Sequence, residues 1–321
     1  MKTSTLLTTC HLPIVLVALT GLNLAAATLY VSLESPNPSA PHPTWATAAT
    51  TIQDAVDAAA AGDEIVVTNG VYATGGRALY GTMTNRVVVD KPITVRSVNG
   101  APFTAIQGAQ APGGGNGDSA VRCVYLANGA RLSGFTLTNG ATRMDGEPFH
   151  ERCGGGVWCQ SAAAVVSGCV LAGNSAAMRG GGASSGTLNN CALTGNWAWQ
   201  GGAVCSNVLN NCTLTFNSAE ECGGGAYCSR LNNCIVYFNT ARLAAANYAG
   251  GFLSYCCTTP QPEDPWHGPG NITLDPQLTS AFRLSSGSPC RGAGSSDYHY
   301  SDILSDFHFS SSFKRRFRWD W

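Results

Sequence analysis

One stretch of the sequence gathers most of the side chains that could carry out acid–base chemistry. Residues 141–153 contain Arg143 and five candidate catalytic residues, which are Asp145, Glu147, His150, Glu151 and Arg152. Carboxylates and a histidine can act as general acid and base, and an arginine can hold a substrate carboxylate through paired hydrogen bonds. The same composition is typical of a solvated loop whose opposite charges compensate one another. Both interpretations stay open.

Four aromatic residues could instead bind a ligand by stacking. These candidates are Trp158, Trp197, Trp199 and Tyr227. Trp197 and Trp199 follow the corner residue Asn196, and we expect Trp158 and Tyr227 to share a face. An aromatic ring offers a flat apolar surface against which a sugar ring can pack. Packing of the same rings at corners of the fold is the structural alternative.

These residues lie on or beside a repeat that must position them. Asn189-Asn190-Cys191 recurs as Asn210-Asn211-Cys212 and as Asn232-Asn233-Cys234, with Cys169 one period earlier and Cys256 one period later. The cysteines are therefore 22, 21, 22 and 22 residues apart. A period of this length, with short apolar segments and Gly-Gly pairs, is typical of a solenoid of stacked β-coils. At this period, residues 64–257 would form roughly nine coils.

Residues one period apart would stack on one another. The first four cysteines are each followed five residues later by an asparagine, which gives two predicted ladders, Cys169, Cys191, Cys212, Cys234 and Asn174, Asn196, Asn217, Asn239. Asparagine amides can bond from coil to coil, and free cysteine packs inward as a small hydrophobe. Disulfides remain an alternative for the cysteines in a secreted chain. We expect no metal site, because Cys-x-x-Cys pairs with supporting histidines are missing from the sequence.

The outward positions of the predicted coils carry almost no charge. Alternation along the strand after each Gly-Gly pair places Trp158, Ser184, Val204 and Tyr227 outside. Residues 154–219 contain a single charged residue, Arg179. Glycoside hydrolysis needs two positioned carboxylates, and calcium-assisted elimination needs several carboxylate oxygens and a base. We therefore expect no active site on these strands, no cofactor, and Ca²⁺ only if the chain is a lyase.

Composition and the ends of the chain bear on its location. Lys2, the apolar run 12–19 and Ala25-Ala26-Ala27 are typical of a signal peptide, so we assign residues 1–27 to a leader and expect the chain to be secreted or at the cell surface. No later run is long and apolar enough for a transmembrane helix. The net charge of −1 gives no electrostatic footprint for nucleic acid.

Several segments resemble one superfamily. Thr51-Ile52-Gln53-Asp54-Ala55-Val56, Gly62-Asp63-Glu64-Ile65-Val66-Val67 and Gly70-Val71-Tyr72 resemble the N-terminal part of right-handed parallel β-helix proteins of the pectin-lyase-like superfamily. The Asn-x-Ala segments before Gly-Gly resemble coils of bacterial surface β-helix proteins, including polymorphic outer-membrane proteins. Asn271-Ile272-Thr273-Leu274-Asp275-Pro276 resembles their closing coil.

The resemblance implies an all-β, right-handed parallel β-helix. We expect a strand and a capping helix over residues 28–62, coils over about 64–257, a closing coil over about 258–294, and an atypical tail at 295–321. The superfamily mixes enzymes with non-catalytic adhesins, so fold alone leaves function open. We favour an exported bacterial cell-surface or extracellular protein that is a non-catalytic carbohydrate-binding or adhesive module, with a polysaccharide or cell-surface glycan as partner. A polysaccharide lyase or glycoside hydrolase with its site in residues 141–153, and a structural spacer, are the alternatives.

Overall fold

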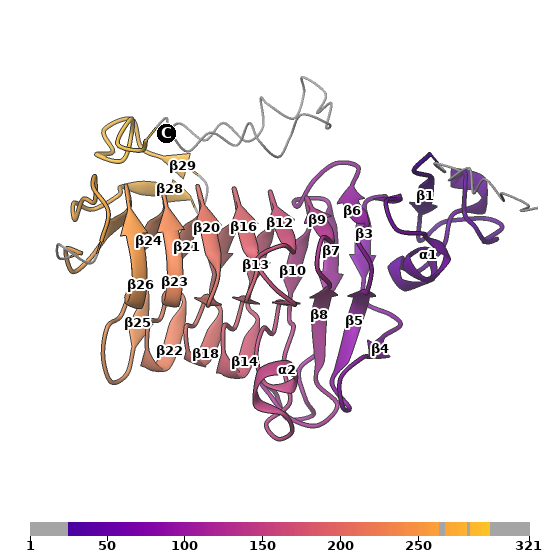
Figure 1. The fold of residues 1–321 in the computed structure, drawn as a ribbon, viewed down its shortest axis with the longest axis horizontal. Helices are drawn as coiled ribbons and strands as arrows, with labels where there is room; N and C mark the ends of the chain where they lie inside the picture. Colours follow the sequence, from indigo (N-terminus) through magenta and orange to yellow (C-terminus); the bar gives the residue numbers. More distant parts are fainter. Residues whose placement is uncertain (1–24, 263–266, 281–282, 296–321) are drawn as a thin grey trace, which may run out of the picture.

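The chain winds into a stack of parallel strands (Figure 1). The computed structural model describes residues 25–262, 267–280 and 283–295. Most of the predicted leader, and the tail after Ser295, lie outside the described residues. In each coil the chain passes through successive strands that pair in parallel with the equivalent strands of neighbouring coils. This pairing confirms the predicted parallel β-helix.

Two strand ladders merge into one 15-stranded sheet, because β23 (Ala226–Asn232) and β26 (Tyr248–Ser254) run through both. The first ladder also contains β1 (Thr28–Val31), β2 (Glu64–Val67), β6 (Thr94–Ser97), β9 (Arg131–Ser133), β12 (Val165–Ser167), β16 (Thr187–Asn189) and β20 (Val208–Asn210). The second also contains β5 (Thr84–Val89), β8 (Val121–Leu126), β11 (Val157–Cys159), β15 (Ala183–Ser184) and β19 (Val204–Cys205), with β4 (Arg77–Ala78) antiparallel at its edge.

Two further ladders complete the coils. The third is an 8-stranded sheet of β3 (Gly70–Tyr72), β7 (Thr104–Gln107), β10 (Thr136–Thr138), β13 (Val170–Ala172), β17 (Ala192–Thr194), β21 (Thr213–Thr215), β24 (Ile235–Tyr237) and β27 (Cys257–Thr258). The fourth has β14 (Ser175–Arg179), β18 (Trp197–Gln200), β22 (Ser218–Cys222) and β25 (Thr240–Ala241). An antiparallel hairpin of β28 (Leu278–Ser280) and β29 (Arg283–Leu284) follows.

The period of about 22 residues describes only the later coils. Stacked asparagines there are 22, 21 and 22 residues apart, whereas the hydrogen bond from Gly140 to Asn174 joins residues 34 apart. The early coils are longer because inserted loops separate β3 from β5, β7 from β8 and β10 from β11. The 8 strands of the third ladder are accordingly fewer than the nine coils that a uniform period predicts.

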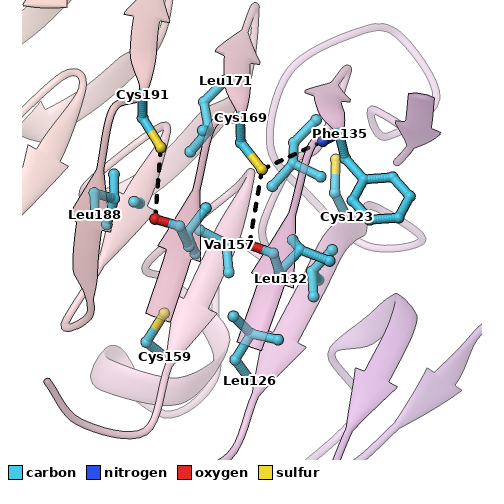
Figure 2. Close-up of a cluster of buried hydrophobic side chains, with 14 of the residues drawn as sticks. Cys123, Leu126, Leu132, Phe135, Val157, Cys159, Cys169, Leu171, Leu188 and Cys191 are labelled. Atoms are coloured by element: carbon cyan, nitrogen blue, oxygen red, sulfur yellow. Dashed lines mark hydrogen bonds between the residues drawn. The ribbon is translucent and has the colours of Figure 1, made fainter. Parts of the chain in front are cut away.

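The interior is a continuous column of aliphatic and cysteine side chains (Figure 2). Leu171 pairs in register with Leu193, Leu193 with Leu214 and Leu214 with Val236, and each of the four is 0% exposed. Full burial of one such side chain stabilises the fold by about 1.5–3 kcal/mol. Cys169, Cys191, Cys212 and Cys234 belong to the same column as free thiols.

The ladder asparagines connect neighbouring coils at a corner between the third and fourth ladders. Asn196 Oδ1 accepts hydrogen bonds from the backbone N–H and the amide group of Asn174, at 3.1 and 3.0 Å. Asn196 and Asn217 donate in the same way to the next asparagine, and Asn239 donates to Asn247. Each buried corner thus has its backbone and side-chain polar groups satisfied by the coil above.

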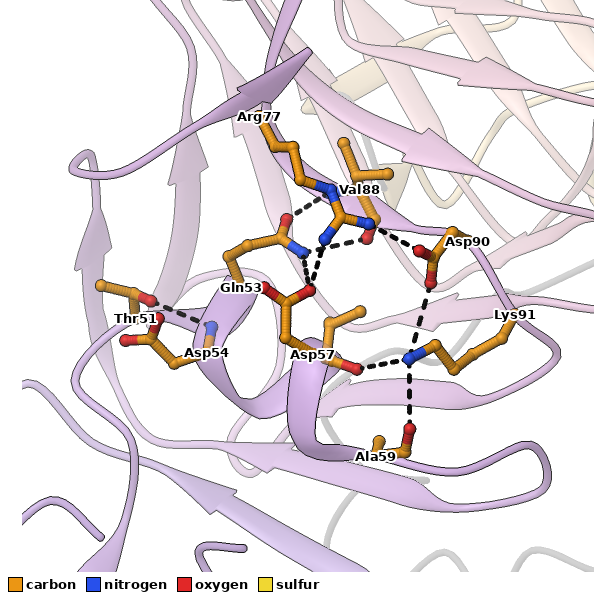
Figure 3. Close-up of polar contacts among 10 residues, drawn as sticks. Thr51, Gln53, Asp54, Asp57, Ala59, Arg77, Val88, Asp90 and Lys91 are labelled. Atoms are coloured by element: carbon orange, nitrogen blue, oxygen red, sulfur yellow. Dashed lines mark hydrogen bonds and ion pairs between the residues drawn. The ribbon is translucent and has the colours of Figure 1, made fainter. Parts of the chain in front are cut away.

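The first helix, α1 (Ile52–Ala58), lies at the N-terminal end of the stack (Figure 1). The Thr51 hydroxyl caps it by accepting a hydrogen bond from Asp54 N, and Ile52, Ala55 and Val56 face the core. Figure 3 shows how polar contacts fasten the helix to β5. Gln53 bonds both the N–H and the carbonyl oxygen of Val88.

Two charged side chains complete this attachment of α1 (Figure 3). Arg77 contacts the carboxylates of Asp57 and Asp90 at 2.6 and 2.5 Å. Lys91 donates to the carbonyl oxygens of Val56 and Ala59, near the end of the helix. The remaining helices of the described chain are the 3-10 helix η1 (Trp45–Thr47) and α2 (Pro148–Glu151). None of the described helices has the length and apolar character needed to cross a membrane.

Candidate functional site

The outer face of the second ladder is lined by one column of aligned residues. The register stacks Val88, Tyr125, Trp158, Ser184, Cys205, Tyr227 and Ala249 in successive coils. Cys205, and not Val204, occupies the outward position in β19. Val204 is 0% exposed and lies in the core, so its predicted outward orientation was wrong.

The error comes from the glycines before each strand. Gly201 N–H donates to Cys222 O while Gly180 N–H donates to Gln200 O, so Gly201 is equivalent to Gly180 and not to Gly181. The run 180–182 holds three glycines, whereas the equivalent run in the next coil is Gly-Gly-Ala. Aligning pairs by sequence therefore shifts β19 by one residue, and a shift of one residue exchanges the two faces of a strand.

At the N-terminal part of this face, four rings pack together where the loop 141–153 meets the sheet. Tyr125 and Trp158 are stacked with centroids 5.4 Å apart, and the His150 ring lies 5.0 Å from Trp158 and 4.4 Å from Tyr80. The indole N–H of Trp158 donates to Phe149 O at 2.7 Å. Trp158 is only 7% exposed, so its ring anchors the loop and cannot serve as the open platform that we considered.

Glu151 is also engaged in holding the loop in place. Its carboxylate accepts hydrogen bonds from the backbone N–H groups of Thr82 and Glu147, at 2.9 and 2.8 Å, and lies 3.6 Å from Arg143 Nε. These hydrogen bonds lower the pKa of Glu151. A Cβ atom at Gly81 would lie 2.4 Å from Glu151 Oε1, so the close approach of the two segments requires glycine there.

The buried Arg122 fixes the other side of the loop. Its guanidinium donates to the carbonyl oxygens of His150, Cys153 and Gly154 and to Asn85 Oδ1. Burial lowers its pKa to about 10, so the side chain still carries its charge at neutral pH. Sequence reasoning missed this residue, because an arginine between Val121 and Cys123 of a strand gives no sign that it faces carbonyl groups.

Glu147 and His150 remain as the acid and base of the loop. Glu147 Oε2 accepts from the backbone N–H of His150 and contacts its Nδ1 atom, both at 2.6 Å. The first of these hydrogen bonds is the main reason that the pKa of Glu147 is lowered. Asp145 is exposed, and Arg152 is half-buried with its Nε atom unpartnered.

The loop therefore does not bring two free carboxylates together. Glu151 is committed to backbone N–H groups, which leaves Glu147 paired with a histidine of its own helix. Glycosidases place two carboxyl groups across the scissile bond. Within the described ranges, no three His, Cys, Asp or Glu side chains converge as metal ligands would.

The other aromatic candidates lie farther along the stack. Trp197 and Trp199 project from β18 and are 37% and 45% exposed, while Ala198 between them faces the core. Trp199 Nε1 donates to Glu221 Oε2 at 2.8 Å. Tyr227 is half-buried, and the Arg179 guanidinium lies 5.6 Å from its ring centroid. Trp197 and Trp199 are thus open to a ligand, whereas Tyr227 is partly covered.

A second exposed pair of rings was missed by the sequence analysis. Phe216 and Phe238 follow β21 and β24, are 65% and 39% exposed, and stack with centroids 5.5 Å apart and an interplanar angle of 9°. Both have positive φ, 57° each, at a corner where the two preceding coils carry Gly173 and Gly195. The sequence did contain a signal for this pair. A phenylalanine stands in two successive coils at the position where the two preceding coils have a glycine.

The chain was compared with known proteins by sequence and by structure. No family model and no curated protein sequence matches the chain. Similar solved structures include pectate lyase Pel9A, at 12% identity and a TM-score of 0.45, with 73% of this chain and 63% of the lyase covered. A rhamnogalacturonan lyase aligns at 12% identity and a TM-score of 0.43, with 79% and 64% covered.

Pectin methylesterase PemA from Erwinia chrysanthemi aligns at 13% identity and a TM-score of 0.41, with 72% of each chain covered. The chain thus spans less than two thirds of the length of the pectate lyase and of the rhamnogalacturonan lyase. At these identities and TM-scores the likeness carries no conclusion about a reaction. The resemblance to polymorphic outer-membrane proteins stays a prediction.

Proposed function

We propose that this protein is an exported β-helix module that binds a polysaccharide outside the cell or at its surface, without catalysing a reaction itself. The proposed binding surface consists of Trp197, Trp199, Phe216 and Phe238, and we call it the aromatic corner. It lies where the third ladder turns into the fourth. Its side chains present ring faces and little charge, which suits the apolar faces of sugar rings.

The observation that carries this proposal is the pair Phe216 and Phe238. A left-handed backbone conformation costs a non-glycine residue roughly 1–2 kcal/mol, and an exposed ring recovers little of that by burial. Gly173 and Gly195 show that glycine fits this corner. Strained non-glycine residues cluster at functional sites, because the surrounding structure holds them there for a purpose other than stability.

The register of the coils brings the tryptophans next to this pair. Trp197 on β18 pairs with Ser218 on β22, and Phe216 precedes Ser218 by two residues. Successive coils are separated by about 4.8 Å, so Phe216 and Phe238 form a short row along the stack. Trp197 lies in the adjacent column, where the neighbouring coils carry Ser175 and Ser218. A row of rings on a rigid scaffold is suited to a long polymer more than to a small molecule.

The experiment is a glycan-array screen followed by affinity electrophoresis in gels that contain the polysaccharides bound on the array, with pectins and alginates included. The double variants Phe216→Gly with Phe238→Gly, and Trp197→Ala with Trp199→Ala, are each expected to lower affinity at least tenfold. Phe149→Ala is the matched control, because Phe149 is 56% exposed but lies in the loop 141–153. Equal binding by all variants would contradict the proposal.

The alternative is a polysaccharide lyase or glycoside hydrolase, and the contact between Glu147 and His150 is the observation that favours it. A histidine beside a carboxylate can abstract or deliver a proton. Unsaturated products that absorb ultraviolet light, or new reducing ends, would reveal such an activity. If Glu147→Gln and His150→Asn abolish product formation while the aromatic variants do not, the enzyme hypothesis replaces ours. A structural spacer would show neither binding nor turnover.

A further inference from the structure

Two cysteines outside the core ladder meet at the C-terminal end of the stack. Cys257 on β27 and Cys290 after β29 are 3% and 1% exposed and belong to one small apolar cluster. The Cys257 thiol donates a hydrogen bond to Leu274 O at 3.2 Å, at the start of the closing segment. We propose that Cys257 and Cys290 form a disulfide in the exported protein, and that this bond fastens the closing segment, residues 274–295, to the coils.

The closing segment packs on the outer face of the last coils. Figure 1 shows β28 and β29 beside the C-terminal end of the stack. The cluster joins Cys257 and Ile235 of the coils to Cys290, with Leu278 and Leu284 of the hairpin packed against it. The segment has a small core of its own, and small units of this kind are commonly stabilised by disulfides in oxidising compartments.

Among the described residues, side chains of the coils bond the backbone of this segment. Asn233 bonds the N–H and the carbonyl oxygen of Ser295, at 2.9 and 3.1 Å. Within the segment, the Ser288 hydroxyl donates to Pro276 O and accepts from Cys290 N. These contacts fix the backbone on both sides of Cys290 and so hold its thiol against Cys257. A disulfide would close a loop between residues 33 positions apart (290 − 257).

The core ladder has a different construction. Cys169, Cys191, Cys212, Cys234 and Cys256 each donate an S–H hydrogen bond to the carbonyl oxygen two residues earlier, at 3.1–3.3 Å. Each repeats the environment of the one before. A disulfide between two of them would remove two of these hydrogen bonds and break the repeat. We therefore expect the ladder cysteines to remain thiols.

The reaction is a thiol–disulfide exchange, and its oxidant is a disulfide such as oxidised glutathione or a disulfide oxidoreductase of the export compartment. The Cys290 thiolate attacks one sulfur of that disulfide, which breaks its S–S bond and releases one thiolate. The Cys257 thiolate then attacks Cys290 Sγ in the mixed disulfide and releases the second thiolate. The two thiol protons pass to the released thiolates, and the oxidant gains the two electrons that the pair loses.

Exchange would take place before the closing segment docks, because Cys290 is only 1% exposed once the segment is in place.

The test uses the full chain, folded with oxidised glutathione and then alkylated with iodoacetamide without reduction. Peptide mass spectrometry is expected to show one cross-linked pair, Cys257 with Cys290. The ladder cysteines should react with iodoacetamide once the protein is denatured, and they should need no reductant to do so. Dithiothreitol should lower the Tm of the wild type by about 5–10 °C. It should leave the Tm of the double variant Cys257→Ser, Cys290→Ser unchanged.

Cys228→Ser is the matched control, because Cys228 is exposed and lies outside both groups. Its Tm should fall with dithiothreitol as much as that of the wild type. Alkylation of both Cys257 and Cys290 in the unreduced protein would overturn the proposal. A cross-link from either of them to another cysteine would overturn it as well.

Discussion

Asn217 Oδ1 accepts two hydrogen bonds from Asn196, one from its backbone N–H at 3.0 Å and one from its side-chain amide at 2.9 Å. The Asn196 amide also donates to Leu171 O at 2.8 Å, so one side chain spans three coils. Both asparagines are 0% exposed. The corner is therefore held by buried polar groups, and water cannot easily replace a hydrogen-bond partner that is removed there.

Asn196→Ala should lower the free energy of unfolding by about 3 kcal/mol, because Leu171 O, the Asn174 backbone N–H and Asn217 Oδ1 each lose a buried hydrogen bond. Chemical denaturation measures this. Asn210→Ala is the matched control, since Asn210 belongs to a second asparagine ladder, in which its amide donates to Asn189 Oδ1, and is itself partly exposed. That variant should lose about 1 kcal/mol. Equal losses would mean that burial of the first ladder contributes nothing.

The loop 141–153 should weaken in acid because of Glu151. Its pKa is lower in the folded protein than in the unfolded chain, so its contribution to stability is present above the unfolded value of about 4.3. That contribution is lost as the pH falls through the folded pKa. Glu151→Gln should be less stable than the wild type at pH 7, and the difference in Tm should shrink toward pH 3.

Asp145→Asn is the control for this prediction, because Asp145 is an exposed acid of the same loop. Its Tm should follow that of the wild type at every pH. A constant difference between Glu151→Gln and the wild type from pH 7 to pH 3 would show that the Glu151 carboxylate does not act through its charge.

The register of β19 can be checked by two neighbouring substitutions. Val204→Ala removes two methyl groups from the core and should destabilise the protein by about 2 kcal/mol. Cys205→Ser keeps the size of a side chain that lies on the outer face of β19 and contacts the Ser206 hydroxyl, although it is only 2% exposed, and should cost no more than about 1 kcal/mol. Urea unfolding of both variants decides the matter. The opposite order would place Cys205 in the core, as counting from the glycine pairs predicts.

Substitutions at the aromatic corner should change polysaccharide affinity and protein stability in opposite directions. Phe216→Gly relieves a left-handed backbone, so the variant should be as stable as the wild type or up to about 1 kcal/mol more stable, while it loses affinity for polysaccharide. The converse change, Gly195→Phe, would extend the row of rings by one coil. It should strengthen binding and cost roughly 1 kcal/mol, because Gly195 has a φ of +63° and open space for a Cβ atom.

Thermal unfolding and affinity electrophoresis on the same preparations measure both effects. If Phe216→Gly is clearly destabilised, the ring has a packing role and the argument from strain fails. If Gly195→Phe binds no better than the wild type, the row of rings is not the feature that a ligand follows.

Much of the fold was predictable because it repeats. The 22-residue spacing of the cysteines and asparagines allowed the stacking of Asn174 on Asn196 to be inferred without coordinates. The helix after Thr51 could be predicted for a similar reason, since its cap and its apolar face are set by residues close in sequence. The candidate site was harder to predict from the sequence, because its loop belongs to the early coils, where the 22-residue period is broken.

The amino-acid sequence by itself determined the parallel β-helix, the inward cysteines and the scarcity of charge on the later coils, because local spacing decides which side chains stack. Only the tertiary structure decided three contacts. Glu151 accepts a hydrogen bond from the backbone N–H of Thr82, the Trp158 ring packs against the His150 ring, and Cys257 and Cys290 lie in one buried cluster. Each of these contacts joins residues from different coils or loops. Their partners depend on how insertions fold back on the stack, which no spacing along the chain encodes.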